Sequence, residues 1–202
     1  MTYGHGRSSP WGDSGLRVGS DLALGSDARI VRDLDGLRIR AGLATDIDTV
    51  REIERISATR FTGTGLDTGE PTDVATLTER LSMGGLIVAC EGDDNRVAGF
   101  VMFCEVDGCG YIEQIDVLPS HAGRRIGAAL LDAAAEVAKL RGWHALTLST
   151  FKDVPWNAPY FRRLGFAEIA DEHLPPALIS IRADHVAHGV DEKLRVFMRR
   201  AV

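Results

Sequence analysis

The stretch from Gly110 to Leu140 constrains the fold of this chain more than any other, because it predicts a strand, a tight turn and a long helix in succession. Residues 111–117 alternate and are rich in β-branched side chains, as is typical of a strand. Leu118-Pro119 ends the strand, since proline cannot donate to a strand ladder. The helix then places apolar side chains with amphipathic spacing on one face: Ile126, Leu130, Ala133, Val137 and Leu140.

The turn between this strand and this helix is suited to binding an anion. The first backbone N–H groups of a helix have no internal partner and lie at the positive end of the helix dipole. Gly123, Gly127 and Ala128 keep the approach open, and Arg124 and Arg125 add positive charge beside it. Glycines alone would indicate only a tight turn with close helix packing. Together with the paired arginines they favour a phosphate group.

Two common phosphate-binding motifs fit this turn poorly. A P-loop requires Lys-Ser/Thr after its last glycine, and no such pair follows here. A dinucleotide-binding fold requires Gly-x-Gly-x-x-Gly and an acidic residue at the end of the next strand. This turn has Gly-x-x-x-Gly, and residues 145–149 contain no acid.

Residues 111–131 resemble the acetyl-CoA-binding core of the GNAT superfamily of N-acetyltransferases. The phosphate signature of that family, Gln/Arg-x-x-Gly-x-Gly/Ala, aligns with residues 122–127 and matches at Gly127. Ala122 replaces the leading Gln/Arg, and Arg125 replaces the central glycine. The surrounding Val-x-Pro, Ile-Gly-Ala-Ala-Leu-Leu and Leu-Gly-Phe segments strengthen the resemblance, which extends roughly from Leu37 to Arg200.

The resemblance implies an α/β (α+β) fold. Its mixed central sheet of about seven strands has an antiparallel meander, then a splayed parallel strand pair, with helices on both faces. Asp107-Gly108 is a strong hairpin signal in the meander. Patterning predicts further strands at 37–41, 86–90, 97–106, 145–149 and 193–200. It predicts helices after a cap at Thr45 or Asp46, at about 72–83, behind Asn157, and from Pro175-Pro176. The last helix belongs to a long connection, 171–189, expected over the acceptor side or at a dimer contact.

Composition suits one domain with a tail. The chain has 202 residues, 45% hydrophobic and 26% charged. We expect residues 1–36, rich in Gly, Ser and Asp, to be a flexible N-terminal tail with a short ordered piece near Ala28–Val31. Residues 37–202 would form the N-acetyltransferase (GNAT) domain. The net charge of −6 does not favour nucleic acid as a partner.

Other sequence features favour a cytoplasmic protein with no membrane partner. No apolar run approaches the length of a membrane span, and no signal peptide opens the chain. The chain has three cysteines, and such a small and odd number argues against a disulfide framework. We therefore interpret them as small apolar residues in a reducing compartment. No histidine lies at zinc spacing beside them, and we expect no metal.

The resemblance assigns the binding of acetyl-CoA to particular residues. The backbone at Ile115, Asp116 and Val117 would hold the acetyl group and the pantetheine arm. The diphosphate would lie on the turn formed by Ala122, Gly123, Arg124, Arg125, Ile126, Gly127 and Ala128. Asn157 resembles the asparagine of a second family signature and is expected to cap the following helix and also to reach the ligand arm.

Acetyl transfer to an amine requires a base, because an ammonium has no lone pair. Glu113 is a carboxylate on an otherwise apolar strand face, where desolvation would raise its pKa. An ion pair with an arginine is an equally open interpretation of Glu113, and Asp116 on the opposite face is the weaker candidate. The family usually has a tyrosine as the acid four residues before the glycine of Gly-Phe, where this chain has Phe161. Tyr160, one residue earlier, is the candidate acid.

The sequence therefore predicts an acetyl-CoA-dependent N-acetyltransferase that acts on a primary amine by direct attack in a ternary complex. The alternative is a non-catalytic acyl-CoA-binding regulatory module, because Phe161 and Ala122 depart from the family pattern. A nucleotide-binding domain is a third interpretation. The acceptor, a small-molecule amine or an amine of a protein or peptide, is left open, and a homodimer is common in the family.

Overall fold

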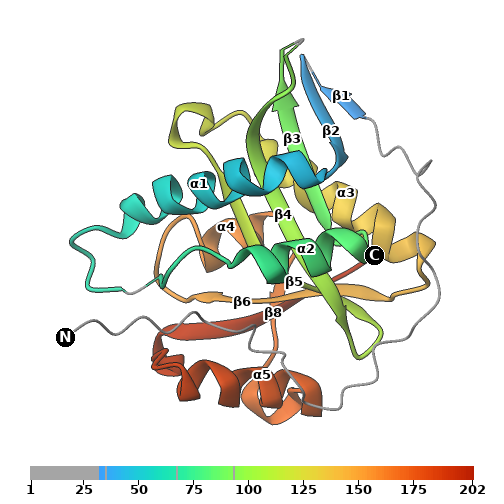
Figure 1. Ribbon diagram of the computed structural model, residues 1–202. Helices are drawn as coiled ribbons and strands as arrows, with labels where there is room; N and C mark the ends of the chain where they lie inside the picture. The colour runs from blue at the N-terminus through green and yellow to red at the C-terminus, as the bar shows by residue number, and fades with distance from the viewer. Residues whose placement is uncertain (1–31, 35, 67, 93) are drawn as a thin grey trace. The chain divides into compact units, whose positions relative to one another are not determined.

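The computed structural model describes residues 32–34, 36–66, 68–92 and 94–202 (Figure 1). The tail expected over residues 1–36, including the piece near Ala28–Val31, thus lies mostly outside the described residues. The strands are β1 (Arg32–Leu34), β2 (Leu37–Ala41), β3 (Leu86–Glu91), β4 (Arg96–Val106), β5 (Cys109–Val117), β6 (Ala145–Phe151), β7 (Ala167–Glu168) and β8 (Arg195–Ala201). The α-helices are α1 (Ile47–Ala58), α2 (Val74–Ser82), α3 (Ile126–Leu140), α4 (Ala158–Arg163) and α5 (Pro176–Ala187).

The strands form a mixed eight-stranded sheet with the order β1-β2-β3-β4-β5-β6-β8-β7. This confirms the expected α/β fold. The chain divides into two compact units. The first contains the described residues up to Phe100 together with Asp116–Gly127, and the second contains Val101–Ile115 and Ala128–Val202.

In the first unit, β2 pairs antiparallel with both β1 and β3. Patterning did not anticipate β1, which is only three residues long. Helix α1 buries Val50 and Ile53 on its apolar face, and α2 buries Leu77. Asp73 caps α2 by accepting a hydrogen bond from the Thr76 amide (2.9 Å). The amphipathic patterns therefore predicted both helices correctly, because each apolar stripe is buried in the core of this unit.

Hydrogen bonds to Glu54 of α1 stabilise the connection between α1 and α2. The Glu54 carboxylate accepts hydrogen bonds from the Thr72 amide (2.9 Å) and the Thr72 hydroxyl (2.7 Å). Arg51 of the same helix donates to the Thr72 carbonyl (3.0 Å). Glu54 is only 7% exposed, and burial raises its pKa in spite of these hydrogen bonds. We refer to this arrangement of Arg51, Glu54 and Thr72 as the loop clasp.

In the second unit, β5 and β6 lie parallel, as the helical connection between them predicted. They pair only where Gly110–Ile112 meets Leu146–Leu148, although β6 continues to Phe151. The expected divergence of these two strands is therefore present. The hairpin before β5 is also confirmed, since Asp107 and Gly108 both have positive φ, 51° and 68°.

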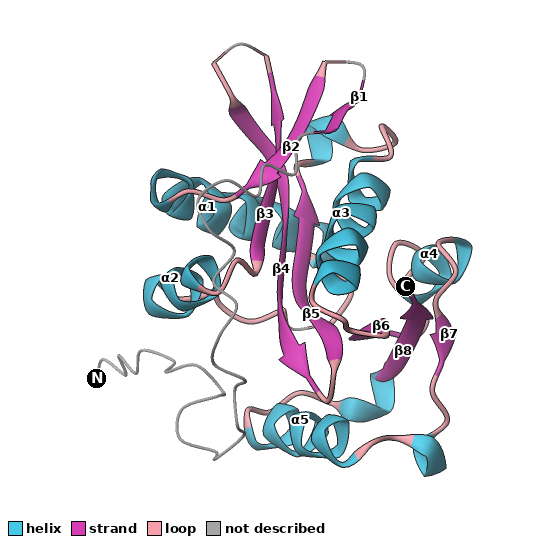
Figure 2. Ribbon diagram, turned by 90° about the vertical axis from the view of Figure 1, so that its right-hand side faces the viewer, coloured by secondary structure: helices cyan, strands magenta, loops and turns pink. Residues whose placement is uncertain are grey.

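Strand β8 has helices against both of its faces within the second unit (Figure 2). Phe197 stacks on His185 of α5, with ring centroids 6.3 Å apart. Arg200 is on the opposite face by strand alternation and donates to the Leu131 carbonyl of α3 (3.1 Å) and the Leu164 carbonyl after α4 (3.3 Å). The connection 171–189 thus contains the expected helix, α5.

Two details of the core differ from the sequence-based expectation or refine it. Leu140, predicted on the apolar face of α3, is 70% exposed because it is the last residue of the helix. The three cysteines are free thiols: Cys90 and Cys109 are buried, and Cys104 is half-buried.

No helix among the described residues is both long enough and apolar enough to span a bilayer.

Candidate active site

The turn before α3 leaves several backbone amides without a partner. A short 3₁₀ turn at Pro119–His121 ends with the Ala122 amide donating to the Pro119 carbonyl (3.2 Å). From Gly123 to the first turn of α3, no amide donates to a backbone carbonyl in the part of the chain that the structure describes. A side chain at Gly123 would meet no atom within 4 Å, so this surface is open. An anion can therefore approach these amides directly.

Arg125 adopts a left-handed backbone conformation, with φ of 60°. L-residues other than Asn and Asp rarely adopt it, because Cβ crowds the backbone. Arg125 occupies the position at which the family signature has its central glycine. The substitution has therefore kept the backbone path that glycine normally allows, and the Arg125 side chain is exposed.

Glu91, the last residue of β3, organises the same turn. It accepts a hydrogen bond from Arg124 Nη1 (2.5 Å), and its other carboxylate oxygen lies 2.9 Å from His121 Nε2. The hydrogen bonds from His121 and then from Arg124 lower the pKa of Glu91. Sequence reasoning did not find Glu91, because it lies 33 residues from Arg124 along the chain. Of the two predicted arginines, Arg124 thus has a carboxylate partner already.

The end of β5 in the first unit is fixed by close backbone contacts. The Leu118 amide donates to the Ala98 carbonyl (2.9 Å). A Cβ at Gly99 would lie 2.8 Å from the Asp116 carbonyl oxygen and 3.1 Å from a Val117 methyl group. Only glycine allows this approach, so Gly99 helps to set the position of the backbone that sequence analysis assigned to the acetyl group.

The remaining predicted diphosphate residues differ in what they can contribute. Ile126 is 1% exposed, so only its backbone amide can face a ligand. Gly127 and Ala128, the next two residues of α3, are half-buried.

In the second unit, Glu113 is half-buried on the face of β5 that also bears Tyr111. Ile115, two residues further on, is half-buried as well. Burial raises the pKa of the Tyr111 hydroxyl, and the nearby charge of Glu113 contributes to the same direction of shift. Glu113 is therefore a carboxylate at the margin of a buried surface, as its position in the alternating pattern suggested.

Asn157 is the N-cap residue of α4, as expected, but its side chain makes no cap hydrogen bond, so the expected cap bond is wrong. Of the two amide positions that can donate to such a cap, the first is occupied by Pro159, which has no N–H. The next amide, of Tyr160, donates to the backbone carbonyl of Asn157 instead (2.8 Å). The Asn157 side chain donates to the Thr150 hydroxyl of β6 (2.8 Å). Its carbonyl oxygen is buried and has no hydrogen-bond partner in the described residues.

The two neighbouring aromatic residues of α4 have different surroundings. Phe161 is 6% exposed and meets the Phe166 ring edge-on, with centroids 5.7 Å apart. Tyr160 is half-buried, and the Arg163 guanidinium lies 5.8 Å from its ring centroid. The ring at the usual position of the family's tyrosine is therefore a core residue, whereas the hydroxyl-bearing ring is partly accessible.

Comparison with known proteins agrees with this geometry. A family model described as the acetyltransferase (GNAT) family matches residues 50–166. The fold resembles that of N-acetylglutamate synthase from Neisseria gonorrhoeae, solved with coenzyme A and N-acetyl-glutamate. The TM-score is 0.64 at 18% identity, over 84% of this chain and only 36% of the synthase chain.

Two smaller proteins match over nearly their whole length. A GNAT-family acetyltransferase from Staphylococcus aureus has a TM-score of 0.64 at 17% identity, covering 82% of this chain and 98% of its own. The PaiA N-acetyltransferase from Thermoplasma acidophilum, solved with coenzyme A, has a TM-score of 0.62 at 14% identity, covering 82% and 99%. Since the family model spans more than half of the chain, this protein belongs to the acetyltransferase (GNAT) family of acyltransferase enzymes.

Proposed function

We propose that this protein transfers an acetyl group from acetyl-CoA to a primary amine by direct attack in a ternary complex. The observation that carries the proposal is the turn at residues 122–127, with open amides from Gly123 onward, its left-handed Arg125 and its exposed surface, whereas the Ala122 amide is already bonded to the Pro119 carbonyl. Hydrogen bonds from such amides to a charged group contribute roughly 1.5–3 kcal/mol each, so a few of them can hold a diphosphate. The fold relatives solved with coenzyme A support this ligand.

Asn157 supplies a second polar contact for the same substrate. Its buried carbonyl oxygen has no partner in the described residues, which is costly unless a donor arrives. The pantetheine arm of CoA has amide N–H groups that can donate to it. In this proposal Asn157 therefore binds the arm, and its hydrogen bond to Thr150 orients it.

Glu113 acts as the base and Tyr160 as the acid. The amine nitrogen bonds to the thioester carbonyl carbon, the carbon–sulfur bond breaks, and the amine loses a proton to Glu113 directly or through water. Tyr160 returns a proton to the departing thiolate. A half-buried carboxylate suits the first role because it combines access for an amine with partial desolvation. The acceptor is a small-molecule amine or an amine of a protein or peptide.

Purified protein should release CoA from acetyl-CoA when a suitable amine from a panel is present. Glu113→Gln should slow turnover about 100-fold or more, the usual contribution of a general base, without weakening CoA binding. Glu105→Gln, a neutralised exposed carboxylate on β4, is the control and should change neither. Full turnover by Glu113→Gln across the pH range would remove the base assignment.

CoA binding tests the turn itself. Gly127→Leu places a branched side chain over the first amides of α3 and should abolish the calorimetric signal for CoA. Lys139→Leu in the last turn of the same helix is the matched control. The proposal is contradicted if the natural protein does not bind CoA, or if Gly127→Leu binds CoA with unchanged affinity.

A second candidate function, an acyl-CoA-binding module without turnover, is favoured by the burial of Phe161 where the family has its tyrosine. Tight CoA binding with no release of thiol for any amine would identify it.

A further inference from the structure

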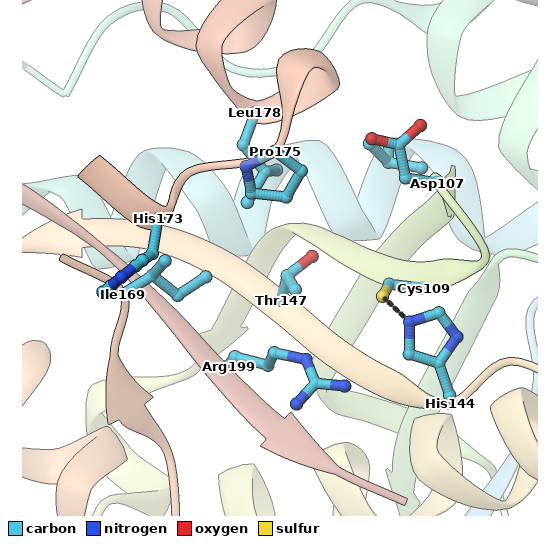
Figure 3. Close-up of a pocket in the computed structure, with 10 residues that line it drawn as sticks. Asp107, Cys109, His144, Thr147, Ile169, His173, Pro175, Leu178 and Arg199 are labelled. Carbon is cyan, nitrogen blue, oxygen red and sulfur yellow. Dashed lines mark hydrogen bonds between the residues drawn. The ribbon is translucent and has the colours of Figure 1, made fainter. Parts of the chain in front are cut away.

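A pocket of about 290 Å³ lies in the second unit, between the sheet and the segment that leads into α5 (Figure 3). Its volume equals that of about ten water molecules in the liquid, which suits a small organic molecule. It is lined by Val106, Asp107, Cys109, His144, Thr147, Ile169, His173, Pro175, Leu178 and Arg199. Cys109 precedes Glu113 by four residues on β5, about 13 Å along the strand, so the pocket is separate from the proposed base.

Thr147 places an unsatisfied hydroxyl at the floor of this pocket. The residue is 4% exposed, and its Oγ1 has no hydrogen-bond partner among the described residues. Figure 3 shows the hydroxyl pointing into the space between the lining side chains. A buried hydroxyl without a partner destabilises the fold, and replacing it by a methyl group would remove the penalty. A ligand in the pocket would satisfy it.

Arg199 brings a positive charge to the same place. It lies directly opposite Thr147 in the β6–β8 ladder, so the two side chains share a face. Arg199 forms no ion pair with a carboxylate in the part of the chain that the structure describes. Burial raises the pKa of the Cys109 thiol, and the positive charge of Arg199 opposes that rise. Arg199 is an exposed residue that lines the same pocket as Cys109.

The other walls restrict the chemistry of the ligand. Ile169, Pro175 and Leu178 form an apolar side, whereas Asp107 and His144 lie at the edge (Figure 3). His144 Nε2 is 3.3 Å from the Cys109 sulfur. No group of three or more His, Cys, Asp or Glu side chains in the described ranges is placed to hold a metal ion. The pocket thus offers a cation, a hydroxyl and an aliphatic wall, with Asp107 and two histidines also in its lining.

We infer that this pocket binds a small carboxylate that carries a branched aliphatic group. Arg199 pairs with the carboxylate, the Thr147 hydroxyl donates to it, and the aliphatic group packs on Ile169, Pro175 and Leu178. Both guanidinium and hydroxyl bonds to a carboxylate are charge-assisted, which makes them stronger than neutral ones. The site is independent of the acetyl-CoA turn and does not depend on acetyl transfer.

Calorimetric titration of the full chain with isovalerate tests the inference, with isovaleramide and inorganic phosphate as the other arms. Isovalerate should bind with one site per chain, with or without saturating CoA. The amide lacks the charge and should not bind, and phosphate lacks the aliphatic group and should bind more weakly. No isovalerate binding, equal binding of the amide, or displacement by CoA overturns the inference.

Two variants separate a ligand role from a structural one. Thr147→Val should weaken isovalerate about tenfold, as expected for the loss of a hydrogen bond to a charged group, while it raises the thermal midpoint of the free protein. Arg199→Gln should weaken isovalerate at least about tenfold. Arg162→Gln, an exposed arginine elsewhere in the unit, is the control and should leave affinity unchanged. If both Thr147→Val and Arg199→Gln are folded and each binds isovalerate with unchanged affinity, the assignment is contradicted.

Discussion

At Arg125 the backbone conformation is one that favours glycine, whereas the side chain carries a positive charge. Its φ of 60° suits glycine, and its guanidinium suits an anion beside the turn. Arg124, its neighbour, is held by Glu91 and has less freedom to bind a phosphate. The proposed diphosphate site therefore combines one arginine that is paired with a carboxylate and another that is exposed and has a strained backbone conformation.

Arg125→Gly and Arg125→Ala separate these two contributions. Both variants lose the guanidinium, so both should bind CoA more weakly than the natural protein and to a similar extent. Only glycine removes the left-handed strain, so Arg125→Gly should be about 1 kcal/mol more stable than Arg125→Ala. Urea unfolding of the free proteins measures the difference. Equal stability of the two variants would show that the turn stores no such strain.

At the scale of elements, the loop clasp joins helix α1 to the segment that enters α2. Glu54 accepts two hydrogen bonds from Thr72 while it is almost fully buried. Because burial raises its pKa above the ordinary value of 4.5, the folded protein retains the Glu54 proton to higher pH than the unfolded chain does. The clasp is therefore coupled to pH.

The sign of that coupling gives a prediction. Between the unfolded and the raised folded pKa of Glu54, unfolding releases a proton, so the free energy of unfolding falls as pH rises through this window. In Glu54→Gln, whose amide can still accept from the Thr72 N–H, this fall should be absent. Urea unfolding from pH 4 upward should show the variant gaining stability relative to the natural protein. Glu52→Gln, exposed on the same helix, is the control, and parallel curves for Glu54→Gln and the natural protein would contradict the prediction.

The elements that sequence patterning predicted are those long enough to have a period. The stripes of α1 and α3, the alternating sequences of β2 and β5 and the long apolar run of β4 each extend over several residues. In contrast, β1 and β7 have three and two residues, too few for any pattern. Asn157 is at the expected N-cap position, but its side-chain cap bond is absent for a local reason, since Pro159 removes one possible donor and the Tyr160 amide donates to the Asn157 backbone carbonyl.

At the scale of the whole molecule, the sequence predicted the family and the location of the turn, because both depend on residues adjacent in the chain. It could not predict Glu91 at that turn, or the meeting of Thr147 with Arg199, because 30 or more residues separate the partners. The second contact depends on the register in which β6 and β8 pair, and the first depends on how the turn before α3 meets the end of β3. The roles of Glu113, Tyr160 and Asn157 in acetyl transfer stay predictions.

The rate at which a buried thiol is alkylated can report local opening of this protein. Cys90 is 1% exposed in the first unit and Cys109 is 8% exposed in the second, and burial raises the pKa of both thiols. An alkylating reagent attacks the thiolate, so it should modify half-buried Cys104 first and Cys90 only after the first unit opens. Peptide mass spectrometry would give the opening rate around Cys90 without any engineered label. Modification of Cys90 as fast as Cys104 would mean that its surroundings are already open in the native state.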